Sequence, residues 1–114
     1  MAGNNGLVMT EMPSSSEIAQ RIVEALHPRR VVLFGSRARG DAGVDSDFDL
    51  MVETDSDLRP HERARQIYGL FGPRRWSMDV VVYTPGEVLA QRQFRNSLIR
   101  SIEREGQVLY EQPG

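Results

Sequence analysis

Short apolar runs alternate along this sequence with segments of helical periodicity, and no other feature restricts the possible folds as strongly. The runs at residues 31–34, 47–52 and 77–83 have the length of single strands, and the first is apolar throughout, as in a strand buried on both faces. Around them, apolar residues recur at the spacing of a helix face. This alternation predicts an α/β or α+β fold, in which a small mixed β-sheet is flanked by helices.

Capping residues indicate where the helices begin. Ser14 with Glu17, and Thr84 with Glu87, match the capping box that opens a helix. His27, beside a proline, is predicted to cap the end of the first helix. The predicted helices cover residues 14–27, 60–71, 85–95 and 97–105, and a fourth strand covers residues 107–110.

Length and composition fit one small domain and exclude several classes of protein. The polar, Gly- and Asn-rich residues 1–13 predict a flexible arm. The length of 114 residues predicts a single domain, over residues 14–114. The absence of cysteine excludes a disulfide framework and a thiolate metal site. No apolar stretch reaches about 18 residues, so no transmembrane helix is expected, and the start lacks the pattern of a secretory signal. The cytoplasm is therefore the expected compartment.

The charge pattern argues against bulk binding of nucleic acid. The formal net charge is −2, whereas proteins that coat nucleic acid carry excess positive charge. All 14 basic residues are arginine, which excludes a phosphate-binding loop lysine and a lysine Schiff base. The planar guanidinium group of arginine remains well suited to phosphate oxygens.

Three aspartates occupy strand positions where apolar side chains are expected. Asp47 and Asp49 lie two apart in one predicted strand, so their side chains share a face, about 6.8 Å apart. Asp79 interrupts the apolar run of another strand. Carboxylates this close repel by roughly 2 kcal/mol at an effective dielectric of 20, and their hard oxygens favour Mg²⁺ or Mn²⁺. Alternatively, such aspartates are turn or cap residues, or Arg37 and Arg39 neutralise them without a metal.

A Gly-Ser pair directly follows the first predicted strand. Gly35 permits a close approach of its backbone to a ligand, and Ser36 adds a hydroxyl to the N–H groups of a segment that could begin a helix. Together they favour an anion such as phosphate, although such a pair is by itself most often a simple turn. A phosphate site beside paired metal ligands is the combination that nucleotide transfer requires.

A family resemblance rests on these same residues. The Gly-Ser pair, ten further residues and the Asp-x-Asp pair, within residues 35–49, resemble the G-S-x10-D-x-D signature of the DNA polymerase β-like nucleotidyltransferase superfamily. The segment GSRARGDAGVDSDFDLMV, residues 35–52, is similar to its minimal nucleotidyltransferases, and the similarity spans about residues 16–110. The resemblance implies the polymerase β-like fold, with Asp79 on the strand next to the aspartate pair.

The resemblance also implies roles for the acids. Asp47 and Asp49 would ligate the metal ions, two Mg²⁺ or Mn²⁺, that carry the nucleotide donor ATP. Asp79 would complete the shell of the catalytic metal and help to deprotonate the acceptor hydroxyl. All three would thus be both metal-binding and catalytic.

Phosphate binding is implied for the turn before these acids. Gly35 and Ser36 would hold the β- and γ-phosphates of the nucleotide. Arg39 is a candidate for a further phosphate contact, and its alternative role is to pair with Asp41 or Asp45 on the same loop.

The implied function follows from the group that the chain resembles. The catalytic core takes up nearly all of these residues, so an acceptor site is expected from another subunit or protein. Minimal nucleotidyltransferases resemble the antitoxins of toxin–antitoxin pairs, which transfer AMP from ATP to a tyrosine of a HEPN-domain toxin. This predicts a metal-dependent protein adenylyltransferase with a HEPN partner and no membrane or nucleic-acid binding. The alternatives are a non-catalytic antitoxin that neutralises its partner by contact, and a nucleotidyltransferase that acts on RNA or a small molecule.

Overall fold

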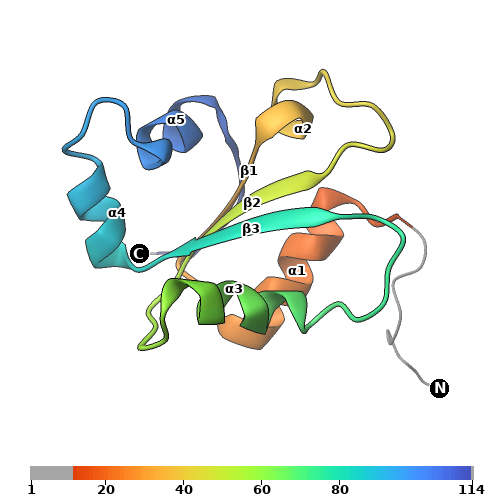
Figure 1. Cartoon of the computed structure of the whole chain (residues 1–114), viewed down its shortest axis with the longest axis horizontal. Coiled ribbons are helices and arrows are strands. Elements are labelled where there is room, and N and C mark those ends of the chain that lie inside the picture. Colours follow the sequence, from red (N-terminus) through yellow and green to blue (C-terminus); the bar gives the residue numbers. More distant parts are fainter. Residues whose placement is uncertain (1–11, 114) are drawn as a thin grey trace.

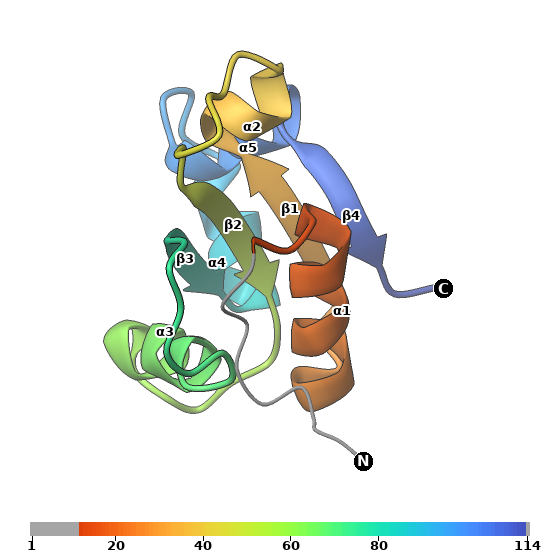
Figure 2. The same ribbon diagram turned by 90° about the vertical axis from the view of Figure 1, so that its right-hand side faces the viewer.

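The computed structural model describes residues 12–113, whose helices and strands alternate largely as the sequence predicts. In chain order the elements are α1 (Ser15–Leu26), β1 (Arg30–Phe34), α2 (Gly35–Arg39), β2 (Phe48–Glu53), α3 (Pro60–Tyr68), β3 (Met78–Tyr83), α4 (Pro85–Gln91), α5 (Leu98–Glu105) and β4 (Gln107–Glu111). The strands form one mixed sheet in the order β3-β2-β1-β4 (Figures 1 and 2). β1 is antiparallel to β2 and β4, whereas β2 and β3 are parallel. Within residues 12–113, no helix has both the length and the apolar character needed to cross a membrane.

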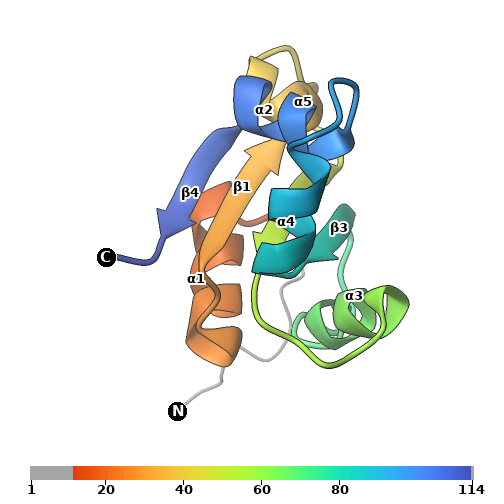
Figure 3. The same ribbon diagram turned by 90° about the vertical axis from the view of Figure 1, so that its left-hand side faces the viewer.

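Helices cover both faces of the sheet and bury a core on each. α1 and α3 cover one face, where Leu50 and Val80 are buried, and α4 and α5 cover the other, where Met51 and Ile99 are buried. Figure 2 views the molecule from the α1 side and Figure 3 from the α4 side. Because successive strand residues face opposite sides, alternate positions of β2 and β3 point toward α4 and α5. This face carries the candidate site.

The ends of two helices differ from the prediction. The helix predicted over residues 60–71 ends at Tyr68, and the one predicted over residues 85–95 ends at Gln91. In each case the next N–H groups bond to carbonyls only three residues back, as from Phe71 to Tyr68 (3.2 Å) and from Phe94 to Gln91 (3.1 Å). Tighter turns of this kind commonly end a helix. Apolar residues have a similar spacing in such a turn and in an α-helix, so the sequence pattern does not show where the α-helix ends.

The predicted helix caps are confirmed. Ser14 and Glu17 exchange the two hydrogen bonds of a capping box (3.1 and 2.7 Å), and the box at Thr84 is also present. His27 adopts the left-handed conformation after α1 (φ 48°). The predicted arm over residues 1–13 lies outside the described residues except for Met12, which is exposed, and Pro13, which is buried.

A buried arginine joins α3 to the edge of the sheet. Arg63 is 7 % exposed, although the apolar spacing predicts Ala64 on the inner face of this helix. Its guanidinium donates to Leu58 O (2.8 Å), Val82 O (3.3 Å) and Glu87 Oε1 (2.7 Å). β3 is the edge strand on this side, and the Tyr68 hydroxyl accepts a hydrogen bond from its Val80 N–H (2.9 Å). α3 therefore covers this edge with polar side chains.

We expect Arg63→Met to lower the free energy of unfolding by about 2 to 4 kcal/mol, because it leaves two carbonyls and a carboxylate without their donor. The bond from Arg63 holds the pKa of Glu87 below its ordinary value of 4.5. The stabilisation by this pair is therefore present above pH 4.5 and is lost as the pH falls through the lowered pKa. Urea denaturation followed by Trp76 fluorescence should show the difference between wild type and variant shrinking in acid.

The exposed neighbour Arg65 provides the matched control, since Arg65→Met should change stability by less than about 0.5 kcal/mol. Equal effects of the two substitutions would contradict a structural role for the Arg63 contacts.

Candidate active site

Two of the predicted acids lie side by side in the sheet. Asp49 in β2 and Asp79 in β3 are register partners in the parallel pair, so their Cα atoms are about 4.8 Å apart. Both occupy the face that α4 and α5 cover, at the end of the sheet beside α2. Asp49 is partly buried and Asp79 is exposed. The structure thus brings together two carboxylates that are 30 residues apart in the sequence.

Asp47 precedes β2 instead of lying within it. It is exposed, and its Oδ1 accepts a hydrogen bond from the hydroxyl of Ser77. The backbone continues this pairing, since Phe48 N–H donates to Ser77 O (3.0 Å). Sequence reasoning did not identify Ser77, because only the register of β2 against β3 places it opposite Asp47.

The charges of the other two acids act on the Asp49 carboxylate. Burial raises the pKa of Asp49 above its ordinary value of 3.8, and the negative charges of Asp79 and Asp47 raise it further. Arg39 acts in the opposite direction and lowers the pKa of Asp49. The acids are therefore close enough for their repulsion to matter, as expected of groups that share a cation.

The Gly-Ser turn lies directly against the Asp49 carboxylate. Gly35 has φ +75°, and a Cβ atom placed on it would lie 2.2 Å from Asp49 Oδ2. A side chain at this position would therefore displace the carboxylate. Ser36 follows in the first turn of α2 and is partly buried. The group that lies against the Gly35 backbone is the Asp49 carboxylate, and the approach of a phosphate to this backbone stays a prediction.

Arg39 lies at the outer rim of the site. Its guanidinium pairs with Asp41 (3.4 Å), and both side chains are more than half exposed. The alternative role for Arg39, pairing with Asp41, is thus present in the structure, but an exposed ion pair of this kind contributes little stability. Because its charge also acts on Asp49, Arg39 stays within electrostatic reach of the acids.

The donor chemistry of the site fits a divalent cation. Carboxylate oxygens on two neighbouring strands and one adjoining loop are the hard ligands that Mg²⁺ and Mn²⁺ prefer. Within residues 12–113, no three acidic or imidazole groups converge closely enough to enclose an ion, and the carboxylate of Asp47 is bonded to Ser77. Asp49 and Asp79 are therefore the acids already placed as a pair, and Asp47 would join them by exchanging its hydroxyl partner for the ion.

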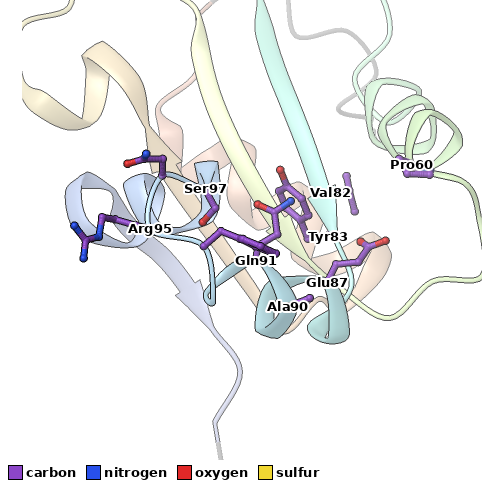
Figure 4. A pocket seen from close by; sticks show the side chains of 10 residues that line it. Pro60, Val82, Tyr83, Glu87, Ala90, Gln91, Arg95 and Ser97 are labelled. Atoms are coloured by element: carbon purple, nitrogen blue, oxygen red, sulfur yellow. The ribbon is translucent and has the colours of Figure 1, made fainter.

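A large cavity lies near the end of β3 that is farther from Asp79. It has a volume of about 900 Å³ and lies between the end of β3, α4 and the connection to α5 (Figure 4). Tyr83 lines it and shares a face of β3 with Asp79, four residues earlier. Phe94, at 66 % exposure, adds an open apolar surface. The cavity contains none of the three predicted acids, so it is distinct from the anionic site.

Comparison with known protein families identifies the family to which the chain belongs. Residues 15–109 match the family model described as the nucleotidyltransferase domain. This chain belongs to the nucleotidyltransferase domain family. The match includes the Gly-Ser turn, all three aspartates and every strand except the last residues of β4. The nucleotidyltransferase domain predicted from the signature is therefore confirmed, and membership of the minimal group stays a prediction.

Solved structures confirm the nucleotidyltransferase fold. A Sulfolobus solfataricus protein assigned as a nucleotidyltransferase superposes with a TM-score of 0.59 at 20% identity, covering 86% of this chain and 78% of that one. A toxin–antitoxin structure with AMP-PNP gives a TM-score of 0.56 at 19% identity, covering 87% of this chain and 75% of that one. A search of curated protein sequences finds no significant match.

Proposed function

We propose that this nucleotidyltransferase transfers AMP from ATP to a hydroxyl, that of a tyrosine, on a HEPN-domain toxin and thereby acts as its antitoxin. The observation that best supports the transferase chemistry is that Asp49 and Asp79 are register partners on neighbouring strands. The Asp49 carboxylate also lies against the backbone of Gly35, where there is no room for a side chain. The similarity in fold to a toxin–antitoxin structure with AMP-PNP supports the choice of nucleotide and the class of partner. The reaction would take place in the cytoplasm, within a single domain over residues 14–114.

The residues of the candidate site would have different roles in this reaction. Asp47, Asp49 and Asp79 would hold Mg²⁺ or Mn²⁺, which when bound supplies charge neutralisation for the triphosphate and the acceptor oxygen. The Gly35-Ser36 turn, with Arg39 at its rim, would hold the β- and γ-phosphates. The acceptor oxygen forms a bond to the α-phosphorus while the bond to pyrophosphate breaks, and Asp79, as the exposed acid, would accept the hydroxyl proton.

Two alternatives remain distinguishable from this proposal. A non-catalytic antitoxin would neutralise its partner by contact alone, and would not need the acid pair in register. A nucleotidyltransferase for RNA or a small molecule would need an acceptor site of matching chemistry. The net charge of −2 and the largely apolar cavity beside α4 favour a protein acceptor over RNA.

Intact mass spectrometry of the partner tests the proposal. The product of the adjacent gene, incubated with ATP, Mg²⁺ and this chain, should gain mass in steps of one AMP, and omission of any component should prevent the gain. The Asp47→Asn/Asp49→Asn double variant, with its fold checked by Trp76 fluorescence, should neither modify the partner nor rescue growth. Rescue by the double variant without a mass change would instead establish the contact antitoxin.

A further inference from the structure

Arg37 fastens the loop that carries the first aspartate to the helix that follows the Gly-Ser turn. From α2 its Nη2 and Nε donate to Ser46 O (2.7 and 3.0 Å), and Nη2 also donates to Val44 O (3.3 Å). Nη2 additionally lies 3.6 Å from Met12 Sδ. The guanidinium of Arg37 therefore contacts the backbone of the loop between α2 and β2 at two positions, one of them directly before Asp47.

The same guanidinium also holds the residue on the other side of Asp47. The Cζ of Arg37 lies 4.0 Å from the ring centroid of Phe48, within the range of a cation–π contact. Phe48 is buried, and its ring makes an edge contact with Trp76 at 5.7 Å. Arg37 thus fixes Ser46 through its carbonyl and Phe48 through its ring, and Asp47 is the residue between them.

We infer that Arg37 is a positioning residue that sets the orientation of Asp47 relative to Asp49 and Asp79; this inference rests on the proposed metal-dependent function. Arg37 and the Gly-Ser turn belong to the same short helix, so the turn and the acid-bearing loop are joined by one side chain. Groups that orient metal ligands in this way are typically worth 10- to 100-fold in metal affinity or activity.

The geometry distinguishes Arg37 from the phosphate-contact candidate two residues later. Arg39 is exposed and pairs only with Asp41 among the described residues, whereas Arg37 is partly buried and its donors face loop carbonyls. A lysine cannot reproduce these contacts, because a single ammonium lacks the planar fork that donates in two directions while stacking on a ring. Charge alone is therefore not what Arg37 contributes.

Hydrogen exchange in the metal-free protein tests the loop contact without any activity. The N–H groups of Gly43, Ser46 and Phe48 are bonded within or beside the loop (3.0 to 3.2 Å) and report on its opening. NMR exchange rates at these three amides should rise by about tenfold or more in Arg37→Gln, because several hydrogen bonds are lost together. Arg37→Lys should fall in between, and Arg39→Gln, which removes the neighbouring charge of α2, should leave the three rates unchanged.

Calorimetric titration with Mn²⁺ in the presence of AMP-PNP then tests the consequence. Arg37→Gln should bind about 10- to 100-fold more weakly than wild type, while Arg104→Gln, an exposed substitution on α5, should bind as wild type does. Unchanged exchange at the loop, or faster exchange with unchanged Mn²⁺ binding, would overturn the inference. If wild type takes up no Mn²⁺ with AMP-PNP, the proposed function fails together with the positioning role, and the exchange rates still show whether Arg37 holds the loop.

Discussion

Asp49→Asn should abolish nucleotide transfer while leaving the fold intact. The substitution keeps the shape of the side chain but removes the charge of the acid that contacts the Gly35 backbone and lies in register with Asp79. A metal-ion contribution of several kcal/mol to the transition state corresponds to a loss of about 10³-fold or more. Transfer of labelled AMP to the partner measures the loss, and Asp57→Asn, on an exposed loop, should transfer normally.

The same substitution should raise the stability of the metal-free protein at neutral pH. Burial and the charges of Asp79 and Asp47 raise the folded pKa of Asp49 above 3.8, so folding favours its protonated form. The stability that this preference provides is fully present below pH 3.8 and is lost as the pH rises through the raised pKa. Because asparagine resembles the neutral acid at every pH, Asp49→Asn should match wild type in acid and exceed it at pH 7.

Thermal unfolding with and without a divalent cation completes this test. Mg²⁺ with AMP-PNP should stabilise wild type at pH 7, by about 2.7 kcal/mol at a hundredfold excess over the dissociation constant, and should not stabilise Asp49→Asn. Normal transfer by Asp49→Asn would show that Asp49 is a structural residue and that the site is assigned incorrectly.

Gly35→Ala should reduce transfer by about 10²-fold, the cost expected when a reacting geometry shifts by about an ångström. A methyl group at Gly35 meets Asp49 Oδ2 at 2.2 Å, whereas one at Gly40 has no atom within 4 Å. Both glycines have a positive φ, +75° and +83°, so alanine at either position costs about 1 to 2 kcal/mol of backbone strain. The Gly40→Ala variant therefore shares the strain and lacks the displacement of the carboxylate.

Parallel urea denaturation and transfer assays separate these two effects. Both variants should lose similar stability from strain, and only Gly35→Ala should also lose transfer. Equal transfer by the two variants would mean that the contact between the turn and Asp49 has no part in the reaction.

The strands and most helix bounds could be predicted because their determinants are local. Apolar runs and capping boxes are read within a few residues, and Ser14 and Thr84 begin α1 and α4 in the structure as predicted. Where the local signal is ambiguous, as in the turns after Gln91, the predicted element is too long.

The contacts around the acids could not be predicted, because strand order and register set them. The pairing of Asp49 with Asp79 was inferred only through the family resemblance, since no local pattern shows which strands are neighbours. Ser77 and Arg63 depend on partners 30 and 24 residues away, and neither has a sequence signal of its own. The sequence offers Arg37, with Arg39, as a cation that could neutralise the acids, whereas in the structure its donors face carbonyls of the loop.

The covered edge of β3 has a consequence for how this domain meets other proteins. Outward-facing backbone groups of Val80 and Val82 already bond to the side chains of Tyr68 and Arg63, so an incoming strand would first have to displace them. Edge-to-edge aggregation and recognition by strand addition are both disfavoured at these positions. A protein partner that docks at the β3 edge must then be recognised through side-chain surfaces. Such surfaces can diverge by single substitutions while the sheet that holds the acids stays unchanged.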